Sequence, residues 1–172
     1  WMLKTISVLV DNKAGVLARV TNLFSRRGYN IDSLAVGTAD RSDISRITVI
    51  VECDDRILDQ IIHQLEKLIC VHKVKVLNEE NNVTRELVLI KVKADAAVRS
   101  EIIQIAEIFR GRIIDLSPET VTIEMTGEEQ KTSALMEMIR DYGILEVART
   151  GKVALDRGTE YLECLEPEEA PL

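Results

Sequence analysis

Apolar residues recur along the chain with two different periods, and these periods predict strands and helices. Runs rich in Ile and Val, some of them alternating with polar residues, are typical of β-strands. Apolar residues that return every three or four positions indicate helices with one buried face. The first half is therefore predicted to run strand, helix, strand, strand, helix, strand, over residues 3–10, 15–27, 31–37, 45–52, the stretch from Asp54 to Ile69, and 71–77.

The second half of the chain repeats this order after a polar stretch. Residues 78–84 (N-E-E-N-N-V-T) show no apolar period and form the best domain boundary. Beyond them the pattern predicts strands at 86–93, 112–116, 120–125 and 144–149, and helices at 98–110 and 128–142. The helix at 98–110 is expected to end at Gly111. The predicted domains are residues 3–78 and 84–158, followed by an acidic tail at 159–172.

This order predicts an α+β protein of two ferredoxin-like βαββαβ domains. Each domain would carry four antiparallel strands with two helices on one face. The other sheet face and the sheet edges would then be free, and free edges invite pairing with another copy. We therefore expect a dimer.

The stretch Val10–Ile31 holds the most informative polar residues of the chain. Asp11 and Asn12 are suited to cap the helix that follows, and Gly28 is suited to the left-handed position at its end. The second helix should be capped by Asp54. The expected buried positions are Val16, Leu17, Val20, Leu23 and Phe24 on the first helix, and Leu58, Ile61, Ile62, Leu65 and Ile69 on the second.

The two ends of the first helix offer groups that suit a small zwitterion. A helix start opened by Gly15 presents backbone N–H groups that can bind a carboxylate. Asn12 and Asn30 supply amide oxygens that can accept from an ammonium group. The residue types alone nevertheless favour a structural interpretation, because caps and turns are the ordinary uses of Asn and Gly.

Four stretches of this sequence resemble one protein family. D-N-K-A-G-V-L-A-R-V (11–20) and F-S-R-R-G-Y-N-I-D-S-L (24–34) are similar to the regulatory (small) subunit of acetohydroxyacid synthase, also called acetolactate synthase. The first of these patterns begins many ACT domains, whereas the second is more specific to this family. Residues 107–115 and 139–155 match as well, so the resemblance covers residues 3–158.

The resemblance implies a regulatory protein without its own active site. Such a subunit binds and activates a catalytic large subunit that uses thiamine diphosphate, and it confers feedback inhibition by valine or related branched-chain amino acids. Its first domain would be an ACT domain that pairs side by side in a homodimer and holds the effector at the interface. The resemblance places the effector-binding residues at Asn12, Ala14, Gly15, Val16, Leu17, Asn30 and Ile31, the last two reaching in from the partner chain.

Composition and charge limit the other functions that the chain could have. A net charge of −7 argues against nucleic acid or an anionic membrane as the main partner, and the absence of a long apolar run or leader pattern leads us to expect a cytoplasmic protein. The cysteines (Cys53, Cys70, Cys164) and histidines (His63, His72) lack the spacing of a metal site. We therefore expect no bound metal and no cofactor beyond the effector.

Three other interpretations remain open at this stage. The chain could be an ACT sensor for another amino acid or another enzyme. It could be a small ferredoxin-like hydrolase such as an acylphosphatase, although residues 11–15 offer Asn and Gly but only Lys13 where an Arg is needed. It could also be an assembly domain that binds no small molecule.

Overall fold

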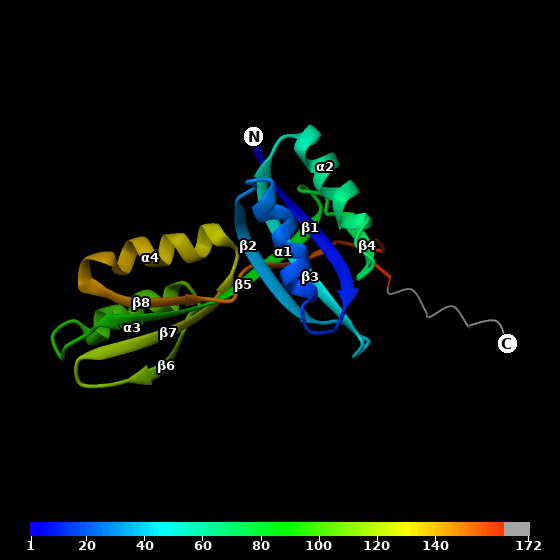
Figure 1. Cartoon of the computed structure of the whole chain (residues 1–172). Helices are drawn as coiled ribbons and strands as arrows, with labels where there is room; N and C mark the ends of the chain where they lie inside the picture. The colour runs from blue at the N-terminus through cyan, green and yellow to red at the C-terminus, as the bar shows by residue number, and fades with distance from the viewer. Residues whose placement is uncertain (164–172) are drawn as a thin grey trace. The chain divides into compact units, whose positions relative to one another are not determined.

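The computed structural model describes residues 1–163, and these form two compact units (Figure 1). The first unit contains residues 1–83 together with the segment that begins at Ala154, and the second contains residues 84–153. Residues 154–158, which the sequence pattern assigns to the second domain, thus pack with the first unit. The predicted acidic tail lies outside the described residues from position 164 onward.

The first unit has the predicted βαββαβ order. Its elements are β1 (Met2–Asp11), α1 (Val16–Arg26), β2 (Ile31–Thr38), β3 (Ile44–Cys53), α2 (Asp55–Glu66) and β4 (Val71–Val76). The sheet order is β2-β3-β1-β4, and each of its three pairings is antiparallel. This is the ferredoxin-like arrangement that the sequence predicts, with β2 and β4 at the edges.

The second unit repeats the arrangement. Its elements are β5 (Asn82–Lys93), α3 (Arg99–Ile108), β6 (Arg112–Leu116), β7 (Thr120–Gly127), α4 (Glu129–Gly143) and β8 (Ile144–Arg149). The sheet order β6-β7-β5-β8 has the same pattern as the first sheet. A further strand, β9 (Val153–Asp156), also pairs with β5, and the sequence pattern does not predict it.

Both helices of the first unit pack on the same face of its sheet. Alternate residues of the central strand β1 point toward them, and the apolar stripes of α1 and α2 meet these residues in one core. The main contributors are Ile6, Val8, Val10, Val20, Phe24, Ile61 and Leu65. Two residues predicted to lie in this core do not: Leu17 is 41% exposed, and Ile69, which follows the end of α2, is 97% exposed.

The helix ends confirm two of the predicted caps. The Asp54 carboxylate accepts a hydrogen bond from the N–H of Ile57 at 2.8 Å, as an N-cap residue does. Gly28 is left-handed (φ 70°), and the N–H of Tyr29 donates to the carbonyl of Phe24 at 3.0 Å. Together with the bond from the N–H of Gly28 to the carbonyl of Ser25, this is a Schellman motif.

The chain that follows β8 returns to the first unit and crosses the sheet face opposite the helices. We call residues 154–160 the return segment. Lys75 on β4 contacts Asp156 at 2.6 Å, and a guanidinium nitrogen of Arg46 on β3 donates to the carbonyl of Ala154 at 3.2 Å. The N–H of Arg157 donates to the carbonyl of Asn81 at 3.0 Å. The return segment is therefore tied to three different parts of the first unit.

Candidate functional site

Gly15 opens α1, and its backbone explains why the helix starts there. It is the N-cap residue, with a left-handed conformation (φ 85°) that a residue with a side chain rarely adopts. The prediction that Asp11 and Asn12 cap this helix is wrong. Asp11 Oδ1 lies 2.6 Å from Nε2 of His72, and the Asn12 side-chain amide donates to the carbonyl of Ser42 at 2.8 Å. Strand β1 extends to Asp11, and the side chains of Asp11 and Asn12 already have these partners before the helix begins.

The first turn of α1 therefore has backbone N–H groups without partners. Among residues 1–163, neither the N–H of Leu17 nor that of Ala18 has a backbone acceptor or a capping side chain. The N–H of Val16 reaches the carbonyl of Lys13 only at 3.4 Å. The first turn contains no acidic residue, so its positive dipole end is not neutralised locally. These groups can bind a carboxylate.

The surroundings of this turn are open. Asn12, Ala14, Gly15 and Leu17 are exposed, and a Cβ placed on Gly15 would meet no atom within 4 Å. Val16 differs from them, because its side chain is buried in the first core. Only the backbone of Val16 can therefore serve a ligand, whereas Leu17 presents its side chain to the outside.

The loop beside Asn12 is held by an ion pair. The N–H of Asn12 donates to the carbonyl of Asp43 at 2.8 Å. The guanidinium of Arg41 contacts the Asp43 carboxylate at 2.6 Å, and its hydrogen bonds hold the pKa of Asp43 below the ordinary value. The ion pair and the backbone bond from Asn12 to Asp43 together hold Asn12 against this loop.

Asn30 and Ile31 lie at the opposite end of α1. The Schellman motif at Gly28 turns the chain into β2, which begins at Ile31. Asn30 is exposed and borders a hollow of about 370 Å³ whose lining also includes Tyr29, Asp32 and Glu52. Ile31 is half-buried against the edge of the first core.

One chain does not bring the two groups of predicted site residues together. Along β3, Ile31 lies opposite Val51, whereas Asp11 lies opposite Ile44. Seven residue steps of a strand correspond to ~23 Å. The Asn12–Leu17 group and the Asn30–Ile31 group are thus at opposite ends of the first sheet.

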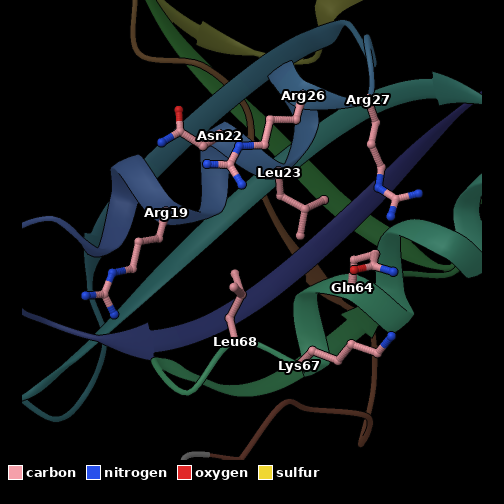
Figure 2. Close-up of a pocket in the computed structure, with 8 residues that line it drawn as sticks. All are labelled: Arg19, Asn22, Leu23, Arg26, Arg27, Gln64, Lys67 and Leu68. Carbon is pink, nitrogen blue, oxygen red and sulfur yellow. The ribbon is translucent and has the colours of Figure 1, made fainter.

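A second surface, which the sequence pattern does not single out, lies between α1 and α2 (Figure 2). We call this hollow of about 360 Å³ the α1–α2 groove; it is lined by Arg19, Asn22, Leu23, Arg26, Arg27, Gln64, Lys67 and Leu68. The spacing of residues 19, 22, 23 and 26 is that of one helix face, and this spacing could have indicated the groove. Its lining contains four cationic residues and no carboxylate.

The described part of the chain shows no cluster of side chains that could bind a metal ion. Residues 1–163 contain no group of three His, Cys, Asp or Glu side chains that could hold a metal ion. Cys53 and Cys70 are buried free thiols, and burial raises the pKa of Cys53. Of the helices in residues 1–163, none combines the length and the apolar character that crossing a membrane requires.

Comparison with known proteins identifies the family from both units. Residues 6–73 match the model of the ACT domain of the acetohydroxyacid synthase small subunit, and residues 85–158 match the model of the small subunit of acetolactate synthase. A probable acetolactate synthase small subunit of Archaeoglobus fulgidus is 54% identical over 159 residues, which are 92% of this chain and 99% of that protein.

Two further relatives indicate the same family. The acetolactate synthase small subunit of Mycolicibacterium smegmatis is 51% identical over 154 residues, which are 90% of this chain and 91% of that protein. The crystal structure of the acetolactate synthase small subunit from Thermotoga maritima superposes with a TM-score of 0.88 at 42% identity and covers 93% of this chain and 100% of that one. The chain therefore belongs to the acetolactate synthase small-subunit family, and its first unit carries the ACT domain of that family.

Proposed function

We propose that this protein is the non-catalytic regulatory subunit of an acetolactate synthase. In this role it binds and activates a catalytic large subunit that uses thiamine diphosphate, and it makes that subunit sensitive to feedback inhibition by valine. Membership of the small-subunit family supports the assembly with a larger partner. The observation that carries the effector role is the open first turn of α1, with unpartnered N–H groups beside Gly15.

The chemistry of this turn suits a free amino acid. Leu17 and Ala18 are exposed, and their backbone N–H groups would bind the valine carboxylate. Leu17, which is exposed, would contact the isopropyl group, and the carbonyl oxygen of the Asn12 amide is available to accept from the ammonium group. An apolar contact of this kind separates valine from leucine or isoleucine by only ~1–3 kcal/mol per methylene. All three branched-chain amino acids are therefore candidate effectors.

The second group of site residues would come from another copy of the chain. Strand β2 is at the edge of the sheet, and within residues 1–163 its strand partner is β3. If two copies pair β2 with β2 about a two-fold axis, the start of one strand meets the end of the other. The end of β2, Thr38, lies opposite Ser45, which is next to the position facing Asp11. Asn30 and Ile31 of one copy would then approach residues 12–17 of the other.

A site divided between two chains provides a mechanism for regulation. Valine would bind tightly only to the dimer geometry that brings both halves together, so it would increase the population of that geometry. A catalytic subunit that prefers a different geometry would lose activation by the same coupling free energy. No chemical step by this chain is needed.

The test is a calorimetric titration of the purified protein with L-valine, using two variants at one position. Asp and Asn are nearly equal in size, and both tolerate the left-handed conformation of Gly15 better than other residues do. Only Gly15→Asp adds a negative charge beside the bound carboxylate. We expect saturable binding by the wild type, and binding at least about tenfold weaker for Gly15→Asp than for Gly15→Asn.

The catalytic subunit provides the second measurement. Both variants should still stimulate it, and only Gly15→Asp should make it insensitive to valine. Normal valine binding by Gly15→Asp would show that the site is elsewhere. If the wild type bound no branched-chain amino acid even with the catalytic subunit present, the chain would be an assembly domain instead.

A further inference from the structure

The α1–α2 groove combines an apolar floor with a cationic rim. Leu23 on α1 and Leu68 after α2 are half-buried, and both pack against the first core. Arg19, Arg26 and Lys67 are exposed. In Figure 2 the side chains of the two arginines project from α1, and Lys67 comes from the end of α2 across the groove.

The cations of this groove differ from three other cations of the first unit. Lys4, Arg41 and Lys75 each form an ion pair with a carboxylate. Within residues 1–163, no ion pair joins a carboxylate to any of the groove cations Arg19, Arg26, Arg27 and Lys67. The chain as a whole carries a net charge of −7. A concentration of unpaired positive charge in an acidic protein creates a local field that attracts an acidic partner.

The extent of the groove selects the class of that partner. Arg19 and Arg26 are seven residues apart on α1, which corresponds to ~10 Å along the helix axis. A small anion would contact one or two of the four cations and would leave the leucine floor uncovered. An extended peptide segment with several carboxylates and one apolar side chain matches both the rim and the floor.

We propose that the α1–α2 groove is a docking surface for an acidic segment of the catalytic subunit. Carboxylates of that segment contact Arg19, Arg26, Arg27 and Lys67, and one of its apolar side chains covers Leu23 and Leu68. The identity of the partner rests on the proposed function. The effector site uses other residues, so docking and valine binding can be changed separately.

The test compares two doubly substituted proteins with the same change of charge. Arg26→Glu/Lys67→Glu reverses one cation on each wall of the groove. The control, Arg56→Glu/Arg112→Glu, reverses two exposed cations that do not line it. Binding of each full-length protein to the purified catalytic subunit is measured by titration at low and at moderate salt. L-valine binding by each protein is measured in parallel.

We expect the groove variant to bind the catalytic subunit at least about tenfold more weakly than the wild type, while the control stays within about twofold. Added salt should weaken wild-type binding more than that of the groove variant, because solvent-exposed ion pairs are screened. Valine binding should be the same in all three proteins. Weaker binding to the catalytic subunit would then result from the change in the groove and not from a general change in the protein.

The other outcomes overturn the inference in recognisable ways. Equal binding by the wild type and the groove variant shows that the groove is not the docking surface, and the proposed function stands. No binding by the wild type removes the proposed function itself. A change in the sedimentation of the groove variant alone assigns the groove to contacts between copies. Wild-type binding to a 20-nucleotide single strand, lost in the groove variant, assigns it to nucleic acid.

Discussion

Gly15 and Asn30 stand at the two ends of one helix, so a ligand that needs both must take them from two chains. Gly15 follows β1 at one end of the sheet, and Asn30 precedes β2 at the other. A two-fold dimer would contain two such sites, each built from Gly15 of one protomer and Asn30 of its partner. This arrangement makes a prediction that a site within one chain does not make.

Two variants that do not bind valine on their own should regain binding when their subunits are mixed. Gly15→Asp alone damages one half of every site, and Asn30→His alone damages the other half, so each homodimer should fail to bind valine. In a mixed dimer one site carries both substitutions and the other carries neither. After subunit exchange at equal concentrations, about a quarter of the wild-type sites should return, as the two-fold symmetry requires. Calorimetric titration of the mixture with L-valine measures this number.

The control for this mixture is each variant exchanged with itself, which should regain no binding. If the mixture also stays inactive although exchange is shown by mass spectrometry of the dimers, the two residues do not share a site between chains. If Asn30→His alone binds valine normally, Asn30 is a turn residue only.

Single residues also show where sequence reasoning succeeds and where it does not. The caps at Asp54 and Gly28 were predictable, because the residue type and its distance from the apolar stripe agree. Asp11 and Asn12 have the right type but the wrong position, because β1 extends to Asp11 in register with β3, and the side chains of Asp11 and Asn12 contact His72 and Ser42. Register depends on the pairing of distant segments, so a local pattern does not contain it. The left-handed Gly15 is the actual N-cap.

Among the elements, β9 is the one that the sequence pattern does not reveal. Four residues are too few to show a period, and β9 pairs with β5, whose start at Asn82 precedes the residues that pair with β7 and β8. The return segment carries Asp156, whose side chain is 7% exposed and pairs with Lys75. A nearly buried carboxylate depends strongly on a cation that pairs with it closely.

We therefore expect Lys75→Gln to loosen the return segment. The hydrogen bond to Asp156 is the main reason why the pKa of Lys75 lies above its ordinary value of 10.5, with Glu160 adding to it. Because folding raises the pKa of Lys75, the Lys75–Asp156 pair contributes its full stabilisation of the folded protein below pH 10.5. This contribution is lost as the pH rises through the higher folded-state pKa of Lys75. Hydrogen exchange of residues 154–157 should be faster in the variant at neutral pH, and the difference from the wild type should shrink in strong alkali.

Lys73 provides a matched control on the same strand. It is separated from Lys75 by one residue, so it lies on the same face of β4, and no ion pair joins it to a carboxylate among residues 1–163. Lys73→Gln removes the same charge and should leave the exchange of residues 154–157 unchanged. Equal effects of the two substitutions would mean that general charge, and not the Lys75–Asp156 pair, holds the return segment.

At the scale of the whole molecule, the chain passes between its two units twice. It leaves the first unit after Val83 and comes back at Ala154. The repeated βαββαβ order made the two domains and the boundary near residue 84 visible in the sequence. The return to the first unit was not visible, because it depends on contacts of Arg46, Lys75 and Asn81 with residues far away in sequence.

This connection predicts that the second unit can be removed without unfolding the first. The N–H of Arg157 donates to the carbonyl of Asn81, so the two chain crossings lie side by side, and a short Gly-rich linker can replace residues 84–153. The shortened protein should keep valine binding within about threefold of the full chain, because every proposed effector residue is in the first unit.

A fragment of residues 1–83 alone lacks the return segment. Leu9 and Ile50, which are buried and lie on the sheet face opposite the helices, should become more exposed in it. That fragment should therefore melt several degrees below the linked protein. Both proteins are compared by calorimetric melting and by titration with valine. Equal melting temperatures would mean that the return segment does not stabilise the first unit. Loss of valine binding by a folded linked protein would place part of the effector site in residues 84–153.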